Sequence, residues 1–109
     1  MARYIITGSY TAAAMKGMIA KPSDRAKATS ALVAAGGGTM EGYYLTTGDH
    51  DFSMVVSTDD LAGMIATLMV AGASGAVTGL KSVQAFTSEE FMAAQKRAGE
   101  IASKYQPPN

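Results

Sequence analysis

Residues 40–57 read MEGYYLTTGDHDFSMVVS and contain two strand patterns joined by a turn. Met40–Thr47 and His50–Ser57 are rich in β-branched and aromatic residues, which favour strands. Gly48-Asp49 between them suits a tight turn, because glycine adopts a positive φ without steric cost. The stretch also holds the only histidine of the chain. The pattern predicts a β-hairpin, and we expect any chemistry to take place in it or beside it.

The segments that flank this hairpin alternate between strand and helix patterns. Arg3–Tyr10 and Val77–Phe86 have the composition of strands. After the first strand, apolar spacing predicts a helix that Thr11 caps and Pro22 interrupts, since a proline disfavours helical geometry in the residue before it. Ser23 is expected to cap the second part of this broken helix.

Two further helices follow the hairpin. Ser57 or Thr58 is expected to cap the first of them. Its predicted buried stripe consists of Leu61, Ile65, Leu68 and Met69. The second begins with a capping box, in which Thr87 and Glu90 satisfy each other's free backbone amides. Its apolar contacts are expected to continue through Ala94, Ala98 and Ile101.

The predicted element order is therefore β-α-β-β-α-β with an added C-terminal helix. This order defines an α+β protein with a ferredoxin-like fold, in which two helices cover one face of a four-stranded antiparallel sheet. A chain of 109 residues fits one domain, residues 1–109. The second face of the sheet has no intramolecular cover, and an open apolar face of that size favours a partner. We expect the partner to be a second copy, in a homodimer or a higher homo-oligomer.

Composition narrows the function classes. The sequence has no cysteine, which excludes disulfides, thiolate metal sites and a cysteine nucleophile. Nine basic and nine acidic residues balance, and without a basic block the chain lacks a surface that would neutralise a run of phosphates. The apolar run near the N-terminus is too short for a signal or a membrane-spanning segment. We expect a cytoplasmic protein with no nucleic-acid or membrane partner.

Alternation along the strands predicts which side chains face the uncovered side of the sheet, because successive strand residues point to opposite faces. The expected helix-facing core comprises His50, Phe52, Met54 and Val56. The expected open face comprises Thr7, Ser9, Tyr43, Leu45, Thr47, Asp51, Ser53, Val55 and Ser57. Hydroxyls, a carboxylate and apolar groups together are typical of a small-molecule pocket, although the same groups would also suffice to satisfy one another across a dimer interface. The faces of Thr78 and Lys81 stay unassigned.

Asp49-His50-Asp51 places imidazole and carboxylate groups side by side, as in many metal sites. Adjacent strand residues face opposite ways, so at most Asp49 and Asp51 converge, whereas a metal site needs three or four ligands. We therefore expect no metal, and the sequence points to no cofactor. The glycines at 36–38 follow a helix, which makes them a helix end and not a phosphate-binding loop.

In its motifs the chain resembles the GYD domain family, small bacterial proteins named for a Gly-Tyr-Asp motif. The resemblance covers nearly the whole chain. It rests on Tyr4-Ile5-Ile6, Ser9-Tyr10-Thr11, Gly37-Gly38, Tyr43-Tyr44, Gly48 with Asp51, Ala73-Ser74-Gly75-Ala76-Val77 and Phe86-Thr87-Ser88-Glu89-Glu90. Gly48 and Asp51 match the family motif, while His50 stands where the family usually places tyrosine.

This resemblance implies a dimeric α+β barrel with homodimers formed sheet to sheet, and it implies no particular activity. The leading interpretation is a homo-oligomeric protein that binds a small apolar or aromatic molecule between facing sheets, with Thr7, Ser9, Tyr43, Asp51 and Ser53 as ligand-binding residues. An alternative by analogy of fold is a cofactor-independent monooxygenase or isomerase, with Asp51 as base and Tyr43 or His50 as hydrogen-bond donor. A structural subunit of a larger assembly is the third possibility.

Overall fold

The computed structural model describes residues 1–108. In chain order its elements are β1 (Ala2–Tyr10), α1 (Ala12–Ala20), α2 (Arg25–Ala35), β2 (Thr39–Leu45), β3 (Phe52–Thr58), α3 (Leu61–Ala73), β4 (Val77–Ala85) and α4 (Ser88–Ala102). The strands form one antiparallel four-stranded sheet in the order β2-β3-β1-β4. The predicted fold class is confirmed: the chain has the ferredoxin-like order, with a first helix in two pieces and an added C-terminal helix.

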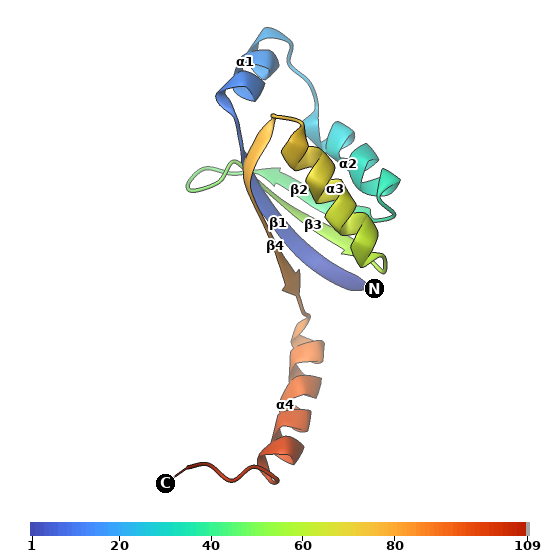
Figure 1. Ribbon diagram of the computed structural model, residues 1–109, viewed down its shortest axis with the longest axis vertical. Coiled ribbons are helices and arrows are strands. Elements are labelled where there is room, and N and C mark those ends of the chain that lie inside the picture. The colour runs from blue at the N-terminus through green and yellow to red at the C-terminus, as the bar shows by residue number, and fades with distance from the viewer. Residues whose placement is uncertain (109) are drawn as a thin grey trace.

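The helices α2 and α3 lie together over one face of the sheet, and α1 lies at one end of it (Figure 1). Helix α4 continues beyond the end of β4 and points away from the sheet, which gives the molecule a longest dimension of 62 Å. Within residues 1–108 no helix covers the second face of the sheet. We call this second side the outer face.

The hydrophobic core lies between the sheet and the helix pair. Its buried members are Ile6, Val33, Phe52, Met54 and Val56. Three of these come from alternate positions of β3, as the alternation predicted. Apolar side chains from α3 and from the other three strands pack around them, so the helix-facing side of the sheet is the protein's interior.

The hairpin connection is longer than predicted. Strand β2 ends two residues before its predicted end and β3 begins two residues after its predicted start, so residues 46–51 form the loop. The backbone N–H of Thr46 donates to the carbonyl oxygen of Asp51 (2.8 Å), and the Thr46 hydroxyl donates to the carbonyl oxygen of His50 (2.8 Å). Gly48 has a φ of 108°, the left-handed conformation expected of a glycine in this turn.

Two of the four predictions about helix starts need correction. Helix α1 begins as predicted, with the Thr11 hydroxyl accepting from the Ala14 N–H (3.2 Å). Helix α2 is capped by Asp24, one residue after the predicted Ser23. An ionised carboxylate two or three residues before the free amides satisfies them as well as a hydroxyl does, so both positions fit the sequence signal.

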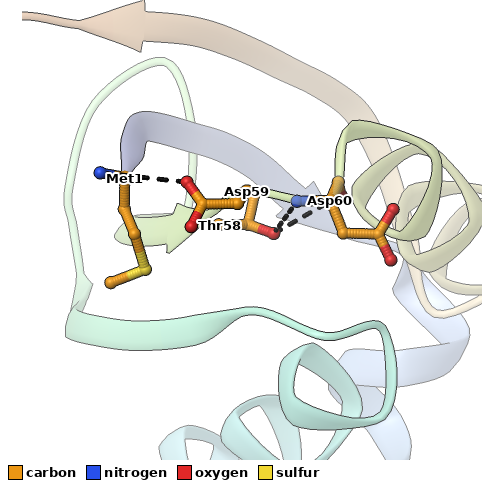
Figure 2. A network of polar contacts seen from close by, with 4 residues as sticks. All are labelled: Met1, Thr58, Asp59 and Asp60. Carbon is orange, nitrogen blue, oxygen red and sulfur yellow. Dashed lines mark hydrogen bonds and ion pairs between the residues drawn. The ribbon is translucent and has the colours of Figure 1, made fainter.

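Helix α3 is capped by Asp60, whose carboxylate accepts from the Gly63 N–H (2.9 Å), and not by Ser57 or Thr58 as predicted. Thr58 instead holds the cap residue: its hydroxyl accepts from the Asp60 N–H at 2.9 Å, beside the pair formed by the Met1 amino group and Asp59 (Figure 2). The polar network of Figure 2 thus fixes the turn from β3 into α3.

The predicted buried stripe of α3 was also wrong. Met64 is the buried residue and Leu68 packs against the core, whereas the other predicted members are exposed: Leu61, Ile65 and Met69. Helix α3 itself carries apolar residues around its whole circumference, so more than one apolar stripe fits the helical period. Tertiary packing decides which stripe is buried.

The ends of α2 and α3 approach each other so closely that only glycine fits. A Cβ atom on Gly63 would collide with the carbonyl oxygen of Gly36, and a Cβ on Gly36 would collide with the hydroxyl of Thr67. This contact fixes the two helices as a pair above the sheet.

Helix α4 begins with the predicted capping box. The Thr87 hydroxyl accepts from the Glu90 N–H (3.1 Å), and the Glu90 carboxylate accepts from the Thr87 N–H (2.8 Å), which holds the pKa of Glu90 below its ordinary value. The predicted contacts at Ala94, Ala98 and Ile101 are absent from the described chain, because the helix buries no residue. Phe91 and Ile101 are each 63 % exposed.

Candidate functional site

A cavity of about 250 Å³ lies between the sheet and the helices α2 and α3. It is roughly the volume that eight water molecules occupy in the liquid, at about 30 Å³ each. Its apolar wall includes Ile6, Leu32, Val33, Phe52, Met54, Val56, Met64, Leu68 and Leu80. We call this space the inner cavity.

Polar groups gather at one part of the wall. Tyr10 of β1 and Tyr43 of β2 meet there through their hydroxyl groups, which hydrogen-bond to each other. Thr29 and Arg25 of α2 line the same cavity. Burial of the Tyr43 phenol, and then its hydrogen bond with Tyr10, raises the pKa of Tyr43, while Thr29 and Arg25 oppose part of that rise. Tyr43 therefore stays protonated at neutral pH and keeps a hydrogen that it can donate.

Phe52 holds the two tyrosines in place. Its ring lies 5.4 Å from the ring of Tyr10 in a tilted arrangement and 6.0 Å from the ring of Tyr43 in a stacked one, measured between centroids. Such aromatic contacts restrict ring orientation in addition to burying area. The tyrosine pair is thus a fixed part of the cavity wall.

Asp51 supports this arrangement from outside the cavity. Its carboxylate accepts a hydrogen bond from the Tyr10 backbone N–H (2.9 Å), and its own N–H donates to the carbonyl oxygen of Gly8 (2.8 Å). These bonds tie the hairpin loop to the end of β1. Asp51 therefore positions the backbone of a cavity residue without lining the cavity.

The structure corrects the predicted face of Tyr43. Tyr43 lies opposite Met54 in the β2–β3 register, and residues that face each other across antiparallel strands share a side of the sheet. It therefore belongs to the helix-facing side, where the inner cavity lies, and not to the outer face. Leu45 lies opposite Phe52 and shares that side as well.

The predicted hydroxyl residues are on the outer face. Thr7 lies opposite Ser53 on one neighbouring strand and opposite Lys81 on the other, and Ser9 lies opposite Thr78. The register thereby assigns Thr78 and Lys81 to the outer face too. In the described part of the chain, Thr7, Ser9 and Ser53 line neither of the two cavities.

His50 is half-buried in the loop, and its carbonyl oxygen accepts from the Thr46 hydroxyl. It lies outside the strand in which the alternation placed it and does not line the inner cavity. Of the three predicted catalytic residues, only Tyr43 thus reaches a cavity. Sequence reasoning missed Tyr10, Arg25 and Thr29, although counting outward from the Gly48-Asp49 turn would have placed Tyr43 opposite Met54.

A second, more open pocket adjoins the inner cavity. Its volume is about 340 Å³, and it is lined by Tyr10, Ala14, Gly17, Met18, Lys21, Ser23, Arg25 and Ala76. We call it the outer pocket. It shares Tyr10, Arg25 and Ala76 with the inner cavity, so the two spaces meet at these residues.

Among residues 1–108 no group of three or more histidine, cysteine, aspartate or glutamate side chains is placed to hold a metal ion. None of the helices over the same range combines the length and the apolar character needed to cross a membrane.

The fold and the cavity define a small α+β protein with a ferredoxin-like core and a mainly apolar internal site. The model of the GYD domain family matches residues 4–94, and the chain belongs to this family. No curated protein matches the sequence. A solved structure described as the crystal structure of FFRP-DM1 is similar over 79 % of this chain and 100 % of that chain, with 15 % sequence identity and a TM-score of 0.49.

Proposed function

We propose that the protein binds a small, largely apolar molecule in the inner cavity. The observation that carries this proposal is the cavity itself, with apolar walls and the hydroxyl groups of Tyr10 and Tyr43 at one part of its surface. Binding sites for small molecules are typically concave and apolar, with a few polar groups that fix orientation. The site proposed from sequence lay between facing sheets, and the cavity on the helix-facing side replaces it.

The size of the cavity limits the ligand and its affinity. About 250 Å³ accommodates a molecule of roughly ten non-hydrogen atoms. At about 0.3 kcal/mol or more per such atom, binding would contribute at least about 3 kcal/mol, and dissociation constants between roughly 1 µM and a few mM are expected. Probes therefore have to be tested up to millimolar concentration.

Two alanine-to-leucine variants in α3 test the proposal. Ala71 lines the inner cavity and Ala66 is exposed on the same helix. We expect Ala71→Leu to fill the cavity and abolish binding of small apolar probes, detected by NMR line broadening of the probe, while Ala66→Leu binds them as the unchanged protein does. Equal binding by both variants would contradict the proposed site. If none of the three proteins binds any of the probes, the result would favour the interpretation of the chain as a structural subunit of a larger assembly.

Catalysis in the same cavity is the second candidate. A protonated phenol beside a guanidinium is a donor set that can stabilise developing negative charge on a substrate oxygen, and Tyr43 and Arg25 provide it. Asp51 suits the role of base poorly, because its carboxylate is turned to the Tyr10 backbone. Conversion of a bound probe, followed by mass spectrometry and lost in Tyr43→Phe, would support this alternative over simple binding.

We further propose that the protein works as a homodimer or a higher homo-oligomer formed through the outer face. Apolar side chains are exposed there, with Tyr44 at 70 % and Val83 at 58 %. Helix α4 adds the exposed Phe91 and Ile101. A stable interface needs about 800 Å² from each partner, and a sheet face together with a helix supplies a surface of that kind. In this proposal a second copy of the chain covers the outer face.

A further inference from the structure

Within the described chain, two basic residues supply all the charge in the walls of the inner cavity and the outer pocket, and one of them lies at the junction of the two spaces. Arg25 lines both spaces and Lys21 lines the outer pocket. Among residues 1–108 no aspartate or glutamate lines either space. The chain as a whole is formally neutral, so this local excess of positive charge is a property of the site and not of the overall composition.

Neither cation forms an ion pair with a carboxylate among the described residues. The ion pairs found between described residues join Met1 to Asp59 and Arg3 to Glu41. Arg25, a half-buried side chain, is therefore left without an acidic partner. A guanidinium presents its N–H groups as a planar fork that matches a carboxylate, and partly buried charges of this kind gain most from an opposite charge.

The tyrosine pair supplies one more donor. Each hydroxyl has one hydrogen to donate, and the contact between Tyr10 and Tyr43 uses only one of the two. The second hydrogen is available to a ligand, to solvent or to the neighbouring Thr29 hydroxyl, which lines the same cavity. Since Tyr43 stays protonated, an acceptor in the cavity meets a neutral phenol that donates and not a phenolate that repels it.

We propose that the ligand is a small monoanionic amphiphile, whose apolar body occupies the inner cavity and whose carboxylate lies at the junction beside Arg25 and the tyrosine pair, with Lys21 in the wall of the adjoining outer pocket. This inference rests on the proposed function and specifies its ligand class. A carboxylate at the junction stays in contact with water through the outer pocket and avoids the high cost of burying an unpaired charge. Its apolar body displaces water from walls that are almost entirely apolar.

The experiment compares octanoate with 1-octanol, which share a chain length and differ in charge at neutral pH. Dissociation constants are measured by NMR for the unchanged protein, Arg25→Gln, Lys27→Gln and Ala71→Leu. Lys27 is an exposed residue of α2 that lines neither space, so its variant removes the same charge from the same helix as a control.

We expect octanoate to bind about tenfold or more tightly than 1-octanol, because hydrogen bonds to charged groups are the stronger ones. Arg25→Gln should raise the dissociation constant of octanoate by about tenfold and leave that of 1-octanol within twofold. Lys27→Gln should change neither dissociation constant. Equal affinities for the two probes, or an equal effect of the two charge-removing variants, would overturn the anionic ligand while leaving the cavity as the binding site. Failure of both probes to bind, or binding that Ala71→Leu leaves unchanged, would overturn the proposed site and this inference together.

Discussion

The carboxylate of Asp51 accepts a hydrogen bond from the backbone N–H of Tyr10 at 2.9 Å. Asp51 is, with Gly48, one of the two residues of this chain that match the motif of its family, and Tyr10 carries one of the two tyrosine hydroxyls of the inner cavity. The bond therefore links the hairpin loop to the candidate site. It gives the motif a physical role in this chain: the loop determines where β1 ends and where its last side chain points.

Removing this acceptor should destabilise the protein without abolishing ligand binding. In Asp51→Ala the half-buried Tyr10 N–H loses its partner, which costs about 1–3 kcal/mol of unfolding free energy. Asp49 is exposed in the same loop, and Asp49→Ala should stay within about 0.5 kcal/mol of the unchanged protein. Urea unfolding measures both. If the two substitutions cost the same, Asp51 has no positioning role.

The contact between α2 and α3 makes two glycines of α3 respond in opposite ways to alanine. Gly63→Ala places a methyl group against the Gly36 carbonyl oxygen and should lower stability by about 1–3 kcal/mol. Gly72→Ala meets no atom within 4 Å, and should raise stability by about 0.5–1 kcal/mol through better helix propensity. Thermal unfolding of the two variants tests this, and a neutral Gly63→Ala would show that the helices do not pack as closely as described.

The raised pKa of Tyr43 predicts a dependence on alkaline pH. Its phenolate is disfavoured in the folded protein, so the phenol's contribution to stability is complete below the ordinary value of 10.0 and is lost as the pH rises toward the folded-state pKa. Tyrosinate absorbance should therefore develop at higher pH in the folded protein than in urea. Tyr43→Phe should remove this delayed component, while Tyr44→Phe, at an exposed position, should leave it. A delayed component that persists in Tyr43→Phe would contradict the burial of this phenol.

Assembly through the outer face predicts an effect of charge at Val83. Sedimentation equilibrium of the unchanged protein should give a mass of at least twice the 11.2 kDa of one chain. Val83→Lys buries an unpaired ammonium in the proposed interface and should weaken association by tenfold or more. Gln84→Lys places the same charge at the neighbouring position, which points to the opposite side of the sheet, and should associate normally. A monomer of 11.2 kDa at micromolar concentration would refute the assembly.

Local signals in the sequence were enough to predict the fold. The caps at Thr11 and Thr87 depend on residues within three positions of each other, and the alternation in β3 predicted its three buried apolar residues. Where two neighbouring positions carry the same signal, as with Ser23 and Asp24, the sequence alone does not choose between them. The stripe of α3 failed for the same reason, because the helix is apolar all round.

The site could be predicted only in part, because its members come from separate elements. Tyr10, Arg25 and Tyr43 belong to β1, α2 and β2, and packing of α2 over the sheet brings them together. No local sequence pattern around Arg25 indicates that its side chain lines a cavity. Composition pointed instead to the hydroxyls of the outer face, which do lie together but line no cavity within residues 1–108.

Methyl NMR on methionine-labelled protein tests the central claim most directly. Of the eight methionines, Met54 and Met64 line the inner cavity, whereas Met69 and Met92 are exposed on α3 and α4. Single Met→Leu variants assign the four signals. On addition of octanoate, we expect the Met54 and Met64 methyl resonances to shift in a saturable way and those of Met69 and Met92 to stay unchanged. Shifts confined to Met69 and Met92, or no shift at millimolar octanoate, would contradict binding in the cavity between the sheet and its helices.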